Sequence, residues 1–160
     1  MFETEAFYSF FKDVSSLIIG VGNPDRGDDG IGSLLAKKLI DAGFTNVVDC
    51  EDVPENFTGE IKNKAPQKII FLDALDFQGE AGDLILLNSD ELATDRFNSH
   101  RPSLGLVANY LKKETGAEIY VLGIQPETIG LEEKLSPKVE KTLNLLYDLF
   151  KRVKKGNINS

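Results

Sequence analysis

The feature that most constrains the fold of this 160-residue chain is the segment LIIGVGNPDRGDDGIGSLLAKKL at residues 17–39. Its apolar start at 17–21 predicts a buried strand, and apolar residues at helical spacing from 31 to 39 predict a helix. The segment contains five glycines, which give the backbone freedom for a tight turn between strand and helix. A strand that turns directly into a helix is typical of a parallel sheet covered by helices.

Strands and helices alternate along the rest of the chain. Further strands are expected at 46–50, 68–73, 83–87 and 118–123, and further helices within 1–15 and at 55–64, 104–111 and 137–153. The connection between the third and fourth strands is short for a crossover, so these two strands are expected to run antiparallel. The sequence therefore predicts one α/β domain over 1–160, with 1–15 as an N-terminal helical extension. Its architecture is expected to be a three-layer sandwich, in which helices cover both faces of a mostly parallel, five-stranded twisted sheet with strand four antiparallel.

The composition excludes several classes of function. A net charge of −8 argues against binding to nucleic acid or to an anionic membrane surface. No apolar run approaches 18 residues and no signal peptide is recognisable, so we expect no membrane insertion and a cytoplasmic location. Cys50 is the sole cysteine, which rules out an intrachain disulfide and a cysteine-based zinc site.

Polar side chains are expected to converge at the carboxyl ends of the strands, where open α/β sheets place their functional crevice. Asp29 lies beyond the first strand, Asp73 ends the third, and Gln125 follows the fifth. His100, the only histidine, lies in the loop before the second long helix. Two carboxylates and one imidazole suit nickel, zinc or iron with open coordination positions. Taken singly, the same residues also fit a helix cap, a turn aspartate and a solvated histidine.

Two nucleotide-binding motifs and one further resemblance match the glycine-rich turn only in part. In the dinucleotide motif G-x-G-x-x-G a third glycine follows closely, whereas here the next glycine after Gly22 is Gly27, and Asp28 and Asp29 occupy the pyrophosphate position. No Gly-Lys-Ser/Thr follows, which excludes a P-loop. VGNP resembles the opening of bacterial peptidyl-tRNA hydrolase, but that resemblance stops after four residues.

Four ordered motifs together resemble the hydrogenase maturation proteases. They are GVGNPDRGDDGIG at 20–32, FLDALDFQGEAGDL at 71–84, the loop that contains His100, and LGIQPETIG at 122–130. In the first motif an aspartate is followed by glycine, which resembles the branch that serves formate-hydrogenlyase and other energy-converting hydrogenases.

The resemblance implies an endopeptidase that acts on the precursor of the [NiFe]-hydrogenase large subunit. It would remove the C-terminal extension after nickel insertion, with Asp29, Asp73 and His100 as the nickel-binding and catalytic residues. Nickel would be recognised on the substrate rather than held tightly by the free enzyme. Water could attack a scissile carbonyl that the metal polarises. Alternatively, a carboxylate could act as the base that activates the water, as in an acidic (aspartyl) protease. The alternative is a non-enzymatic nickel or hydrogenase-assembly binding module.

For five other residues the expected roles are simpler. Asp28 is expected to cap its own helix or to support Asp29. Gln125 is expected either to face the cleft or to anchor its own loop. Arg26 and Arg101 are expected to lie on the surface, and Cys50 to be buried or half-buried.

Overall fold

The structure of the chain is a computed structural model that describes residues 4–12, 16–93, 101, 103–127 and 134–159. Within these residues one sheet has the strand order β2-β1-β3-β5-β4. β1, β2, β3 and β5 are parallel, and β4 is antiparallel to β5. The strands are β1 (Ser16–Gly20), β2 (Val47–Asp49), β3 (Lys68–Ala74), β4 (Leu84–Asn88) and β5 (Glu118–Ile124).

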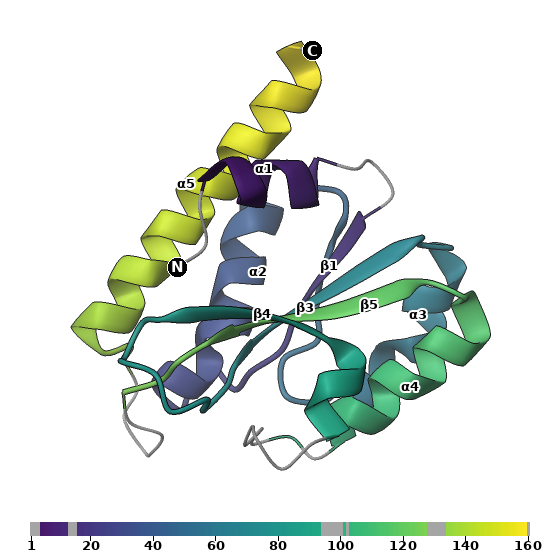
Figure 1. Ribbon diagram of the computed structural model, residues 1–160, viewed down its shortest axis with the longest axis horizontal. Coiled ribbons are helices and arrows are strands. Elements are labelled where there is room, and N and C mark those ends of the chain that lie inside the picture. Colours follow the sequence, from purple (N-terminus) through teal and green to yellow (C-terminus); the bar gives the residue numbers. More distant parts are fainter. Residues whose placement is uncertain (1–3, 13–15, 94–100, 102, 128–133, 160) are drawn as a thin grey trace.

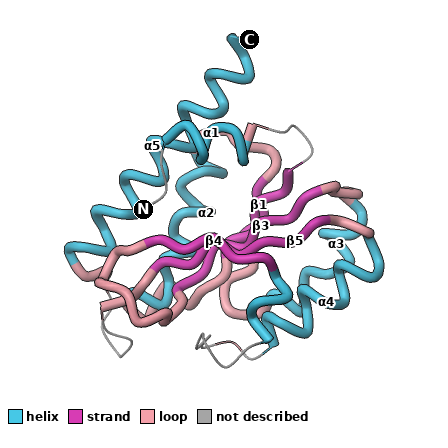
Figure 2. Tube along the Cα trace, in the orientation of Figure 1, coloured by secondary structure: helices cyan, strands magenta, loops and turns pink. Residues whose placement is uncertain are grey.

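Helices cover both faces of the sheet, as predicted (Figures 1 and 2). α1, α2 and α5 lie on one side, and α3 and α4 lie on the other. The helices are α1 (Thr4–Phe11), α2 (Ile31–Asp41), α3 (Thr58–Asn63), α4 (Ser103–Thr115) and α5 (Pro137–Asn159), with short 3₁₀ turns η1 (Asp28–Gly30), η2 (Pro54–Phe57) and η3 (Ser89–Ala93). Within the described ranges, none of the helices has the length and apolar character needed to cross a bilayer.

Alternation along the strands divides the core into two clusters. Ile18, Ile70 and Leu72 pack toward α1, α2 and α5. Their strand neighbours Ile19 and Phe71 pack toward α3 and α4. Because successive side chains in a strand point to opposite faces, a strand buried on both sides is apolar throughout. This explains why the predicted strands are continuous apolar runs.

The fourth strand runs antiparallel to the third, as expected, but it does not pair with it. β5 lies between them and pairs with β3 from Lys68↔Glu118 to Ala74↔Ile124. The connection between β3 and β4 crosses the end of β5, where Gly82 N–H donates to the Gln125 carbonyl (2.8 Å) and Gln125 N–H donates to the Asp83 carbonyl (2.8 Å). Neighbouring strands are about 4.8 Å apart, so this connection is long enough to span one intervening strand.

The N-terminal helix is part of the core. Phe7 and Phe11 of α1 are buried against Phe150 of α5, with ring centroids 5.0 and 4.8 Å from it. α5 begins at Pro137 after Ser136, as the sequence predicts, and its apolar stripe from Val139 to Val153 is buried. Residues 4–11 therefore complete the layer formed by α2 and α5.

Candidate functional site

The glycine-rich turn folds tightly onto the start of α2. Gly22 and Gly27 have φ angles of 153° and 60°, which side-chain-bearing residues rarely adopt. A Cβ on Gly30 would lie only 2.6 Å from the Cα of Pro24, so the turn and the helix start are in direct contact. This close packing buries both Asp28 and Asp29, which are 2% and 5% exposed.

Asp29 and Asp73, predicted to lie at one edge of the sheet, meet at a shared partner, Arg101. Nη2 of Arg101 donates to Oδ2 of Asp29 (2.5 Å), and Nη1 donates to Oδ1 of Asp73 (2.8 Å). All three side chains are buried, and they come from η1, the end of β3 and the segment before α4. His100, the third predicted ligand, lies outside the described residues.

The expectation of a surface role is right for Arg26, which is exposed, and wrong for Arg101, which is only 7% exposed. Two buried carboxylates repel each other and lose their hydration, so a cation between them offsets both effects. The predicted convergence of Asp29 and Asp73 was the signal that could have identified Arg101. A charged residue in a polar loop is usually solvated, and that general rule led to the wrong expectation.

Burial dominates the electrostatics of this cluster. Burial raises the pKa of Asp73 to about 7, Arg101 opposes the increase, and the neighbouring Asp29 carboxylate adds to it. For Arg101, burial lowers the pKa, but the two carboxylates raise it by more, so the guanidinium stays charged. Among the described residues, Oδ1 of Asp29 and Oδ2 of Asp73 are buried without a hydrogen-bond partner. Each carboxylate thus has one oxygen able to accept a hydrogen bond or to contact a cation.

Asp28 does not cap its own helix and instead binds the residue that precedes α5. The 3₁₀ turn that begins at Asp28 follows Gly27 and has no side-chain cap. The Asp28 carboxylate instead accepts from the N–H of Glu127 (2.9 Å) and from the N–H and Oγ of Ser136 (both 2.8 Å). Ser136 immediately precedes α5, whose positive dipole end favours a carboxylate nearby. Asp28 therefore fixes the α5 start to the glycine-rich turn.

Gln125 was expected to face the cleft or to anchor its own loop, and its side chain instead anchors the connection between β3 and β4. Its Oε1 accepts from the N–H groups of Phe77 (2.9 Å) and Gly79 (3.0 Å), and its Nε2 donates to Oδ1 of Asp76 (3.1 Å). The same Asp76 oxygen accepts from the N–H of Gln78 (3.0 Å), as a turn-forming aspartate does. Gln125 thus holds the connection that follows Asp73 against the end of β5.

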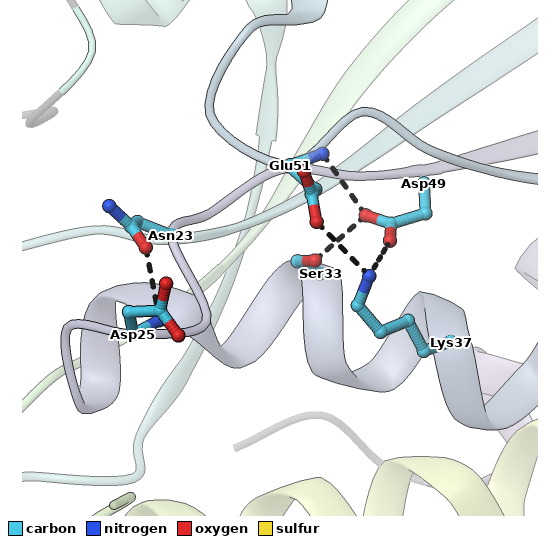
Figure 3. A network of polar contacts seen from close by, with 6 residues as sticks. All are labelled: Asn23, Asp25, Ser33, Lys37, Asp49 and Glu51. Atoms are coloured by element: carbon cyan, nitrogen blue, oxygen red, sulfur yellow. Dashed lines mark hydrogen bonds and ion pairs between the residues drawn. The ribbon is translucent and has the colours of Figure 1, made fainter. Parts of the chain in front are cut away.

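A second polar network links the end of β2 to α2 (Figure 3). Asp49, at the end of β2, accepts from Lys37 Nζ (2.6 Å) and Ser33 Oγ (2.8 Å) of α2. In dinucleotide-binding folds the acid at this position contacts the ribose. Here it is engaged with α2, and Asp28 and Asp29 fill the turn, so the structure gives no support to a dinucleotide site.

Two further observations limit the chemistry available. Among the described residues, no three His, Cys, Asp or Glu side chains form a group that could hold a metal ion. The carboxylates of Asp29 and Asp73 can supply two oxygen ligands, and a third ligand would have to come from elsewhere. Cys50 is fully buried, as expected, and burial raises the pKa of its thiol to about 12. The thiol is therefore protonated at neutral pH and unsuited to nucleophilic attack.

Comparison with known proteins identifies the family. Residues 31–152 match the HycI hydrogenase maturation protease family. The chain belongs to the hydrogenase maturation proteases. As a member of this family it is a peptidase, and the resemblance predicted from its four motifs is confirmed. Asp73 and His100 lie inside the matched range, and Asp29 lies just before it.

Individual relatives agree in sequence and in structure. The hydrogenase 3 maturation protease of Escherichia coli is 29% identical over 84% of this chain and 87% of its own. The crystal structure of the [NiFe] hydrogenase maturation protease HycI from Thermococcus kodakarensis has a TM-score of 0.79 and 32% identity, covering 88% of this chain and 92% of that one. The solution structure of the endopeptidase HycI from E. coli has a TM-score of 0.74 and 29% identity, covering 83% and 86%. The predicted fold is therefore that of solved maturation proteases, and a relative that matures hydrogenase 3 accords with the predicted branch.

Proposed function

We propose that this chain acts in the cytoplasm as the endopeptidase that removes the C-terminal extension of a [NiFe]-hydrogenase large-subunit precursor once nickel has been inserted. Asp29, Asp73 and His100 would contact the nickel ion that the precursor carries. The observation that supports this proposal best is the pair of buried carboxylates, each with one oxygen that has no hydrogen-bond partner among the described residues. Oxygen atoms of this kind, beside an imidazole, suit a borderline divalent ion such as nickel.

The arrangement fits recognition of a metal that is already bound. Two carboxylates and one imidazole leave coordination positions open, so an ion still ligated by substrate thiolates can be shared. Cleavage would then depend on nickel, because a precursor without the metal would not be drawn to the carboxylates. The enzyme would add only a few ligands, which suits transient sensing better than permanent binding.

The same residues offer two routes to hydrolysis. In the first, the carboxylates position the ion so that it polarises the scissile carbonyl. In the second, a carboxylate removes a proton from the attacking water, and a pKa raised to about 7 makes Asp73 a base matched to neutral pH. Protonation of Asp73 in the second route balances the proton lost by water. A covalent route through Cys50 is disfavoured, because that thiol is buried and protonated.

The proposal is tested by incubating the purified chain with nickel-loaded and nickel-free precursor and measuring intact masses. Only the loaded precursor should shorten, and Asp29→Asn, Asp73→Asn and His100→Ala should each slow processing while circular dichroism shows a folded chain. Asp25→Asn, an exposed residue of the same turn, serves as the matched control and should process normally. Equal cleavage of both precursors would overturn nickel sensing, and full activity of all three variants would remove the site. Binding of precursor without a mass change would favour the binding-module alternative.

A further inference from the structure

We propose that Arg101 is an internal counter-ion for Asp29 and Asp73, which suppresses the binding of free divalent metal ions by the enzyme. Nickel presented by a precursor would compete with the guanidinium for the two carboxylates, whereas free nickel would compete poorly. Arg101 would then determine specificity for substrate-held metal. This inference rests on the proposed function for the identity of the ion.

The geometry supports a counter-ion role. Arg101 gives one guanidinium nitrogen to each carboxylate, at 2.5 Å to Asp29 and 2.8 Å to Asp73. The side chain is 7% exposed, so solvent screens these contacts little. A single planar group thus links two acids from separate elements of the fold, which a lysine ammonium could not do in the same forked manner.

The charges explain why free metal should bind weakly. When both carboxylates are ionised, the cluster has a charge of −2 without the guanidinium and −1 with it. An incoming divalent ion must either displace the guanidinium from two charge-assisted hydrogen bonds or settle beside a buried positive charge. An ion from solution has nothing to offset either cost. An ion held by the precursor brings thiolate charge and binding energy from the rest of the substrate.

Arg101 follows directly on His100 in the sequence, so the counter-ion and the proposed third ligand belong to the same loop. A purely structural ion pair is the competing interpretation. Buried ion pairs often contribute little net stability relative to uncharged replacements, so stability alone cannot distinguish the two roles. Metal affinity can distinguish them, because only a counter-ion that competes with metal should lower it.

The test is a titration of the metal-free full chain with NiCl₂ by isothermal calorimetry. Arg101→Gln should bind Ni²⁺ about tenfold or more tightly than the wild type, because the competing cation is gone. Arg101→Lys keeps the positive charge but not the fork, so its affinity should lie between those of the wild type and Arg101→Gln. Arg26→Gln removes an exposed charge from the turn that carries Asp29 and is the matched control, with unchanged affinity expected.

Each outcome decides the proposal. Unchanged affinity in folded Arg101→Gln overturns it, and so does a gain that persists when Asp73→Asn is added, because the ion would then bind elsewhere. If Arg101→Gln is unfolded without metal, refolding from urea is followed by circular dichroism with NiCl₂ and with MgCl₂. Recovery of the helical signal with nickel supports the proposal, and failure to recover with nickel overturns it.

The two proposals fail separately. The nickel titration uses no precursor, so a gain in Arg101→Gln stands even if the wild type cleaves nothing. Conversely, nickel-dependent processing by the wild type with no gain in Arg101→Gln would remove only the counter-ion role.

Discussion

Replacement of Asp28 by alanine should destabilise the protein strongly although Asp28 is not proposed to contact substrate. The carboxylate accepts hydrogen bonds from the N–H of Glu127 and from the N–H and Oγ of Ser136. These donors are about a hundred residues away in sequence and belong to the segment that leads into α5. Asp28→Ala therefore leaves donors without an acceptor at the point where the first and last parts of the fold meet.

The expected loss of unfolding free energy in Asp28→Ala depends on how deeply each donor is buried. Glu127 is exposed, so water can replace the carboxylate at its N–H, whereas Ser136 is buried at 7% exposure. Hydrogen bonds to charged groups contribute about 1.5–3 kcal/mol each, so the two bonds to Ser136 correspond to about 3–6 kcal/mol. Removing a buried charge also returns its desolvation cost, which favours the lower end, about 3 kcal/mol. For a chain of this length that loss lowers Tm by about 6–12 °C.

The assay is urea and thermal unfolding of the purified chain, followed by circular dichroism. Asp25→Ala changes the same charge at an exposed position of the same turn, and should shift the unfolding free energy by less than about 0.5 kcal/mol. A loss below about 1 kcal/mol for Asp28→Ala, or a loss equal to that of Asp25→Ala, would refute this account of the α5 connection.

Three further expectations concern burial and close packing. The thiol of Cys50, with its pKa raised to about 12 by burial, should react with a disulfide reagent at pH 8 only after urea is added; rapid labelling of the folded chain would contradict its burial. Gly32→Ala should destabilise by about 3 kcal/mol or more in urea unfolding, because a Cβ there would overlap the carbonyl oxygens of Leu72 and Val21. Gly105→Ala, on α4 where no atom of the described residues lies within 4 Å of the added Cβ, should instead stabilise by about 0.5–1 kcal/mol, and a loss there would show an unrecognised contact.

Most elements of the fold could be predicted because they have a strong local signal. Apolar runs identified the strands, and steps of three and four identified the helices other than α3, including the long stripe on α5. The order of the strands was less accessible. A short connection indicates the relative direction of two strands, and it cannot show that a later strand will insert between them, as β5 does between β3 and β4. That insertion depends on long-range packing, which no local pattern encodes.

Within the site, positions at the strand ends could be predicted, but the partners of the side chains could not. The sheet topology placed Asp29 and Asp73 together, because both lie at the carboxyl ends of neighbouring parallel strands. The roles of Asp28 and Arg101 depend on atoms that lie far away in the sequence. For Asp28 the nearest helix start seemed the obvious partner, yet the carboxylate reaches α5 instead.

The turn accommodates two adjacent aspartates because a 3₁₀ turn directs successive side chains about 120° apart. Asp28 then points toward the start of α5, and Asp29 points toward Arg101 and β3. A glycine-rich turn before a helix normally offers its N–H groups to a phosphate. Here the N–H of Asn23 donates to Oδ2 of Asp29 (3.3 Å), so the side chain of the turn itself supplies the anion. A turn that carries its own anion should attract cations rather than phosphates, which explains both the buried Arg101 found there and the metal ion proposed to compete with it.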